Sequence, residues 1–102
     1  MKIPDKIQIL GVEIPTVWDD KLCDDKEVYG HADYNKGIIL LQKKTLHTER
    51  SDDMLWQVYL HEVMHWIYHI LRYPDDRGDE DKVDRMASAI LQIIKQILEA
   101  SE

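Results

Sequence analysis

Several residue types are scarce in this chain, and each scarcity excludes a class of protein. The 102 residues include one cysteine, so an intrachain disulfide is impossible, and we expect a reducing, cytoplasmic setting. The 13 basic side chains are outnumbered by 20 acidic ones, and the formal charge of −7 disfavours direct binding to nucleic acid. No apolar run reaches the length of a membrane span, and the first residues contain no apolar signal core.

The residues that are present fit one small folded domain spanning residues 1–102. Apolar side chains make up 44% of the chain and charged ones 32%, a balance typical of ordered proteins. Phenylalanine is absent, so three tryptophans and five tyrosines must supply the aromatic packing. A chain of this length can bury a core, but only a small one.

Alternating apolar residues in the first forty positions predict β-strands. Two strands are expected at 6–10 and 12–18, and Pro15 places the second of them at an edge or at a bulge. Two more, at 27–33 and 38–42, flank a Tyr-Asn-Lys-Gly sequence in which Asn and Gly supply the positive φ of a hairpin turn. We therefore expect a small antiparallel sheet of three or four strands.

The second half of the chain predicts two helices. Ser51 is a good N-cap for the first, which should run to about Arg72, because the residue before Pro74 avoids the helical conformation. The second opens near Asp79 and runs to about Ala100, with apolar residues at the i, i+3, i+4, i+7 spacing. The predicted fold class is α+β, with the small sheet packed on two long C-terminal helices.

The first predicted helix contains an H-E-x-x-H motif, His61-Glu62-Val63-Met64-His65. Residues four apart share a helix face, so both imidazoles can reach one zinc ion at about 2.0–2.1 Å. Glu62 lies beside them, where it can act as general base on a water activated by the metal. The helix is apolar nearly all round, so a line of polar residues on it needs a reason. The alternative is two histidines bonded to backbone or carboxylate groups.

A catalytic zinc ion needs a third protein ligand, which the motif does not supply. Two helical turns, about 12 Å along the axis, separate His69 from His61, so His69 fits better beside the metal site than in it. Glu80 opens the next helix after a short turn and is the better candidate. Asp79 and Asp81 are rivals one residue away.

Asp84 lies four residues after Glu80, so the two side chains share a helix face. We expect Asp84 to accept the free ring N–H of a metal-bound histidine and to fix its tautomer. The alternative is that both are ordinary acids favoured by the helix dipole. A donor to the oxyanion of the substrate is also needed, and His69, Tyr73 and His31 are candidates that the sequence does not rank.

The motif and its surroundings resemble a known family, the ImmA/IrrE-type metallopeptidase domain. The similarity covers the H-E-x-x-H helix, the histidine that follows at His69, and the acidic cluster that leads into the next helix. It extends over residues 5–98 and is closest to the short, stand-alone versions found in phage and prophage gene sets. One departure is Met64, at a position that is usually glycine in the family.

The resemblance implies a minimal zincin-like domain of the gluzincin kind, with three zinc ligands and one base. These residues are His61, His65 and Glu80 for the metal, and Glu62 for proton transfer. The resemblance also implies that the strand at 38–41, with Ile39 and Leu40, runs beside the cleft and could pair with an extended peptide.

Two functions therefore compete, and a third possibility contains no metal. The first is a zinc-dependent endopeptidase that hydrolyses a peptide bond in a specific protein target, such as a phage or prophage regulatory protease. The second is a binding protein with a non-catalytic zinc ion that modulates a host or phage partner. The third is a metal-free helical scaffold with histidines in its core. A nucleic acid or a membrane is not expected as a direct partner.

Overall fold

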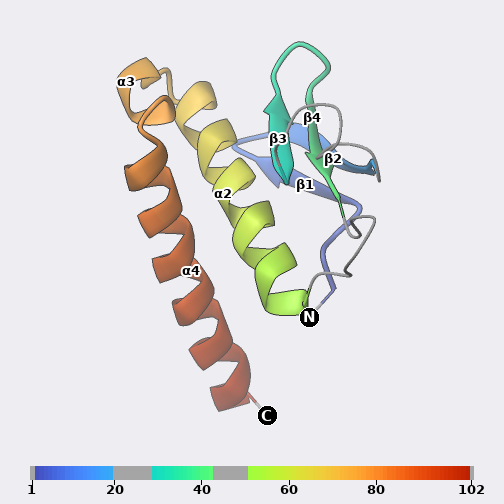
Figure 1. Ribbon diagram of the computed structural model, residues 1–102, viewed down its shortest axis with the longest axis vertical. Helices are drawn as coiled ribbons and strands as arrows, with labels where there is room; N and C mark the ends of the chain where they lie inside the picture. Colours follow the sequence, from blue (N-terminus) through green and yellow to red (C-terminus); the bar gives the residue numbers. More distant parts are fainter. Residues whose placement is uncertain (1, 20–28, 43–50, 102) are drawn as a thin grey trace.

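The computed structural model describes residues 2–19, 29–42 and 51–101, in which four strands form one mixed sheet and three helices follow (Figure 1). The strands are β1 (Lys6–Ile9), β2 (Val12–Trp18), β3 (Gly30–Asp33) and β4 (Ile38–Leu41). The helices are α2 (Asp52–Ile70), α3 (Pro74–Arg77) and α4 (Glu80–Ser101). The predicted α+β class, with a small sheet on two long helices, is confirmed. None of these helices is long and apolar enough to cross a membrane.

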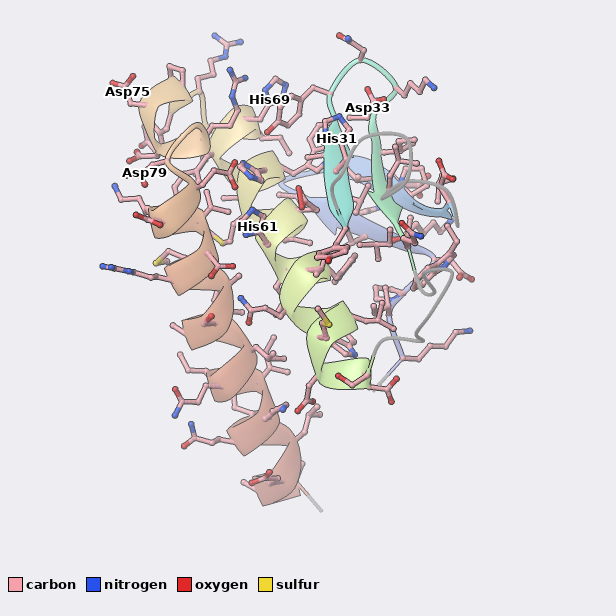
Figure 2. The ribbon with its side chains drawn as sticks, in the orientation of Figure 1. His31, Asp33, His61, His69, Asp75 and Asp79 are labelled. Atoms are coloured by element: carbon pink, nitrogen blue, oxygen red, sulfur yellow. The ribbon has the colours of Figure 1, made fainter. Side chains whose placement is uncertain are left out.

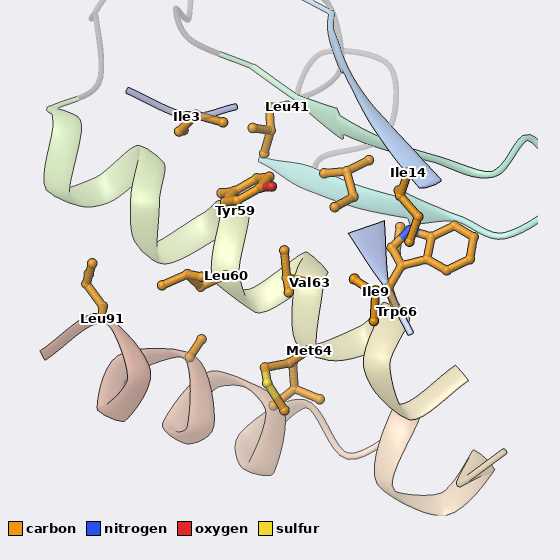
Figure 3. Packing of buried hydrophobic residues seen from close by; sticks show 14 of the residues in the cluster. Ile3, Ile9, Ile14, Leu41, Tyr59, Leu60, Val63, Met64, Trp66 and Leu91 are labelled. Carbon is orange, nitrogen blue, oxygen red and sulfur yellow. The ribbon is translucent and has the colours of Figure 1, made fainter. Parts of the chain in front are cut away.

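Helix α2 lies between the sheet and α4, which explains why it is apolar nearly all round (Figure 1). On one side Tyr59 packs toward Leu41 of the sheet, and on the other Leu60 and Met64 face α4 near Leu91 (Figure 3). Burying both sides of one helix produces a continuous core in a short chain. Any polar group on α2 is therefore either buried or confined to the rim where the two layers meet.

The strand order is β1-β2-β4-β3, and the sheet is not antiparallel throughout as predicted. The pair β2 and β4 is parallel, with Thr16 opposite Ile39, whereas the other two pairs are antiparallel. The parallel pair arises because β3 forms at the far edge of the sheet. The hairpin then returns β4 between β3 and β2, so β4 runs opposite to β3 and parallel to β2.

The prediction that Pro15 marks an edge strand or a bulge is wrong, because β2 lies in the interior of the sheet. Pairing with β1 extends through Pro15, opposite Lys6, in an unbroken register. Pairing with β4 begins one residue later, at Thr16. The proline thus sits where β2 changes partners, and its missing N–H is tolerated at that point.

The predicted hairpin and helix ends are confirmed, but Asn35 does not have the positive φ predicted for it. Gly37 has φ of 69° and donates its N–H to the Asp33 carbonyl at 2.9 Å, which closes the turn between β3 and β4. The Ser51 hydroxyl accepts the Met54 N–H at 3.2 Å and caps α2. The predicted acidic turn after α2 contains the single-turn helix α3, and α4 begins at Glu80. This short connection places the first turn of α4 beside the last turns of α2. The first two residues of the predicted strand 27–33 lie outside the described residues.

Candidate metal site

Two helices bring three possible ligands together at the rim between α2 and α4. His61 and His65 project from successive turns of α2, and Glu80 is the first residue of α4. The Glu80 carboxylate oxygens lie 2.8 Å from His61 Nε2 and 3.1 Å from His65 Nε2, and the two Nε2 atoms are 3.2 Å apart. One ligand atom from each residue lies within 4.8 Å of the others, so this group could hold a metal ion.

The outer nitrogens of the two rings determine what their inner nitrogens can do. His65 Nδ1 lies 2.8 Å from the Arg77 carbonyl oxygen, which only accepts hydrogen bonds, so Nδ1 must carry the proton. His61 Nδ1 lies 3.2 Å from a carboxylate oxygen of Asp84 and is a donor for the same reason. In neutral rings both Nε2 atoms then present lone pairs toward each other and toward the Glu80 carboxylate. Lone pairs that converge in this way favour a bound cation.

The donor set fits zinc. Two imidazole nitrogens and a carboxylate oxygen form a known catalytic zinc set, and a tetrahedral ion with bonds of about 2.0–2.1 Å holds its ligand atoms about 3.3 Å apart. The 3.2 Å between the two Nε2 atoms lies close to that value, and each Nε2 atom has a different Glu80 oxygen at 2.8 or 3.1 Å. Among the acids at 79–81, Glu80 is the one that contacts both histidines. Asp79 instead accepts the Lys82 N–H at 3.1 Å and caps the start of α4, and Asp81 is exposed.

Asp84 occupies the position at His61 Nδ1 that the sequence predicts for it. It is also held from α2, because the Gln57 side-chain amide donates to Asp84 Oδ1 and to the Asp84 carbonyl, each at 3.3 Å. Each histidine therefore has a different orienting acceptor. For His61 the acceptor is a side chain of α4, and for His65 it is a backbone carbonyl of α3. Such acceptors fix the tautomer and the ring orientation of a metal ligand.

Glu62 lines the same cleft as the three possible ligands, and its side chain lies against Gly30 of β3. Its side chain is only 6% exposed. The pKa of Glu62 is raised from its ordinary value of 4.5 to about 7, chiefly by burial. The charge on Glu80 contributes to the rise, whereas His61 and the Ala32 backbone N–H oppose it. A carboxyl group with a pKa near neutrality can both take and return a proton.

This raised pKa predicts how the stability of the metal-free protein changes with pH. Below pH 4.5 Glu62 is protonated in both the folded and the unfolded states. Between 4.5 and about 7 the unfolded state ionises first, so the folded state loses stability, and the loss is complete above about 7. A shift from 4.5 to about 7 corresponds to about 3 kcal/mol. Glutamine does not ionise, so Glu62→Gln should not show this loss. In chelator, the free energy of unfolding of Glu62→Gln minus that of the wild type should therefore increase by about this amount between pH 4 and pH 8. Parallel stability curves for the two proteins would contradict the assignment.

An open cleft of about 540 Å³ contains the three ligands and Glu62. One wall is α2 with the start of α4, and the other is β3, the edge strand of the described sheet. Gly30 brings this strand close to α2, because a Cβ there would lie 2.5 Å from Val58 Cγ1 and 3.2 Å from Glu62 Cγ. A larger residue at Gly30 would push β3 away from the base, so the glycine sets the width of the cleft beside Glu62.

The other predicted site residues separate into those inside the cleft and those outside it. His31 lines the cleft from β3, and Figure 2 shows it across from α2. His69 lies farther along α2, near the hairpin (Figure 2), where its ring stacks on Tyr34 and its Nδ1 lies 2.9 Å from Arg77 Nη1. Tyr73 is half exposed and does not line the cleft.

Two further residues of the cleft, Tyr34 and Arg77, are not singled out by the sequence. The sequence pattern places Tyr34 only in a turn, although tyrosine is not among the residues that turns prefer. The presence of a tyrosine at a turn position is the signal that could have identified Tyr34. Arg77 is held by His69 and by the face of the Tyr34 ring, with 5.2 Å between its Cζ and the ring centroid. No acid in the described part of the chain forms an ion pair with it.

The expectation that the strand at 38–41 could pair with a peptide is wrong. β4 has a hydrogen-bonded neighbour on each side, β2 and β3, so neither of its edges is open. Ile39 is fully buried and Leu40 is 9% exposed, which removes both from contact with a substrate. Among the described strands, the open edge beside the cleft belongs to β3. The unbroken apolar run of β4 is a signal of this, since such runs are typical of interior strands.

Comparison with known proteins adds no assignment. No model of a protein family matches the chain, and no curated protein or solved structure matches it either. Any functional proposal for this chain therefore depends on the geometry of the cleft and on the motif itself.

Proposed function

We propose that this protein is a zinc-dependent peptidase in which His61, His65 and Glu80 bind the metal and Glu62 is the general base. The observation that carries the proposal is the convergence of two imidazole lone pairs and a carboxylate at separations of 2.8–3.2 Å, with both outer ring nitrogens already paired. The resemblance of the motif to ImmA/IrrE-type metallopeptidases supports the same interpretation, as does a buried carboxyl group with a pKa near 7 in the same cleft.

A zinc ion held by His61, His65 and Glu80 would supply Lewis acidity, which would polarise the scissile carbonyl and lower the pKa of a water molecule toward neutrality. Glu62 takes a proton from that water and passes it to the leaving amine, a role that needs a pKa close to the working pH. The Ala32 N–H lies at the Glu62 carboxylate and holds it in place. Asp84 and the Arg77 carbonyl keep the two histidines in the tautomer that leaves Nε2 free.

The substrate in this proposal is an extended peptide that adds to the open edge of β3. The Gly30–Asp33 strand offers backbone groups along the cleft wall, and β-strand addition is a common mode of peptide recognition. The small size of the cleft and of the chain favours one or a few protein targets over a broad range of substrates. A phage or prophage regulatory role comes from the family resemblance and belongs to the same proposal.

A mixture of short synthetic peptides tests the peptidase activity without knowledge of the target. The protein, loaded with one equivalent of zinc, is incubated with the mixture, and new chain ends are identified by mass spectrometry. We expect cleavage that disappears in chelator and returns when zinc is restored. The matched control is His61→Ala with the same zinc addition, which should cleave nothing. Cleavage that survives in chelator, or that His61→Ala retains, would contradict the proposal. A stable complex with a partner and no cleavage would favour the binding-protein alternative.

A further inference from the structure

We propose that the Tyr34 hydroxyl donates the hydrogen bond that stabilises the negative charge developing on the carbonyl oxygen of a peptide in the cleft. This inference rests on the proposed peptidase function and supplies the oxyanion donor that the sequence did not identify. Tyr34 directly follows β3 and lines the cleft together with His61, Glu62 and Glu80. Its side chain therefore belongs to the wall along which an extended substrate would lie.

The Tyr34 ring is held on several sides by groups from two helices. It stacks on His69 with 4.1 Å between ring centroids and 12° between planes. It meets Trp66 edge to face at 5.1 Å, and the Arg77 guanidinium carbon lies 5.2 Å from its centroid. The Trp66 indole N–H donates to the Ile38 carbonyl at 3.2 Å, so the tryptophan is fixed to the sheet as well. A donor held this firmly is preorganised, which is what transition-state stabilisation requires.

The Tyr34 hydroxyl is available for a substrate. No residue in the described ranges forms a hydrogen bond with it, although the charges of Glu62, Glu80 and Arg77 act on it. Burial raises the pKa of Tyr34 to about 12, so the hydroxyl keeps its proton and remains a donor at neutral pH. It is therefore a protonated donor in the same cleft as the base and the possible metal ligands.

Two of the candidates that the sequence offers, Tyr73 and His69, are less suited to this role. Tyr73 lies outside the cleft. His69 is engaged through Nδ1 with Arg77 and through its ring with Tyr34, so it acts on Tyr34 and not on a substrate. Arg77 connects the two parts of the site, because its side chain contacts His69 while its carbonyl accepts the N–H of the metal ligand His65. Because its ring stacks on Tyr34, His69 is a positioning residue for Tyr34.

The first test measures kcat on a peptide that the wild-type protein cleaves. Tyr34→Phe retains the ring and its contacts but removes the donor, so we expect kcat to fall roughly 10²- to 10³-fold with little change in KM. Zinc content and melting temperature should match the wild type. Tyr73→Phe is the matched control, because it removes an equivalent hydroxyl outside the cleft, and it should leave kcat unchanged. A Tyr34→Phe variant with the kcat of the wild type would overturn the inference.

The second test measures binding and needs no cleavage. The probe is N-phosphoryl-leucinamide, whose tetrahedral phosphoryl oxygens stand in for the oxygens of the reacting carbon. Calorimetry on zinc-loaded protein should show Kd rising roughly 10- to 100-fold in Tyr34→Phe and remaining unchanged in Tyr73→Phe. Equal affinity of Tyr34→Phe and wild type for the probe would contradict the inference independently of any activity.

Two substitutions at His69 test whether its stacked ring positions Tyr34. His69→Ala removes the ring that stacks on Tyr34 and should lower kcat and probe affinity together. His69→Phe restores an aromatic surface without the contact to Arg77, and it should recover most of both. Neither change touches a metal ligand, so zinc content should stay at one per chain. Equal losses in His69→Ala and His69→Phe would show that stacking does not position Tyr34.

The outcomes separate the two proposals. Wild-type cleavage with an unimpaired Tyr34→Phe overturns the role of Tyr34 and leaves the peptidase function standing. Absence of cleavage, with probe binding that depends on Tyr34, overturns the peptidase function and leaves the binding role of the hydroxyl. Absence of both cleavage and probe binding in zinc-loaded wild type overturns both proposals.

Discussion

Glu62→Gln should reduce kcat by roughly 10²- to 10⁴-fold while the protein still binds one zinc ion per chain. Glutamine has nearly the shape of glutamic acid, so the buried space between α2 and β3 remains filled, and its oxygen can still accept the Ala32 N–H. Only the ability to take and return a proton is lost. None of the three atoms proposed to bind the metal belongs to Glu62, so metal binding and cleavage should separate cleanly in this variant.

The measurement pairs zinc analysis with initial rates on one cleaved peptide. Glu62→Asp provides a graded control, because it keeps the carboxyl group but withdraws it from the cleft, and its rate should fall between those of Glu62→Gln and wild type. A zinc-loaded Glu62→Gln protein as active as the wild type would remove Glu62 from the mechanism. A Glu62→Gln protein without zinc would instead indicate that the carboxylate takes part in holding the metal.

Zinc should stabilise the fold strongly, since the ligands come from two helices that unfolding separates. At a free zinc concentration a thousand times Kd, binding to the folded state alone contributes about 4 kcal/mol. Each kcal/mol moves the melting temperature of a domain of this size by roughly 4–8 °C, so a rise on the order of 15 °C or more is expected. Thermal melts in chelator and in buffered zinc measure this difference directly.

Substitutions at the start of α4 assign the third ligand in the same melts. Glu80→Gln should lose most of the zinc-dependent rise, because Glu80 contacts both histidines. Asp81→Asn removes the same charge from the exposed neighbouring position and should keep the full rise. His61→Ala should show no rise. A zinc-dependent melt that is intact in Glu80→Gln would refute the ligand set, and melts insensitive to chelator in the wild type would support the metal-free scaffold.

Much of the fold could be predicted because its signals are local. The glycine of the hairpin turn, the Ser51 cap and the proline after α2 each act over a few residues, and the structure has all three features. The H-E-x-x-H spacing likewise fixes two histidines on one helix face without any tertiary information. Glu80 could be favoured as a third ligand because a short connection forces the second helix back along the first.

The sheet could not be ordered from the sequence, because strand order depends on contacts between distant segments. The hairpin could be recognised from the sequence. Which of its two strands becomes the edge strand depends on the pairing of β4 with β2, in which Thr16 lies opposite Ile39. Tyr34 could not be singled out for a related reason. Its partners, His69, Trp66 and Arg77, lie at least 32 positions further along the chain and meet it only when the sheet docks on α2.

The placement of the ligands also affects how preparations of this protein should be judged. All three possible metal ligands lie in the pair of helices α2 and α4, whereas β3 contributes Gly30 and Ala32 beside Glu62 and leads directly into Tyr34. The helical pair is local in sequence, since His61 and Glu80 are 19 positions apart, and local contacts form early in folding. A preparation with one zinc ion per chain therefore contains an assembled helical pair, but only a probe that reaches β3 reports an assembled cleft. Metal content and assembly of the cleft should therefore be measured separately.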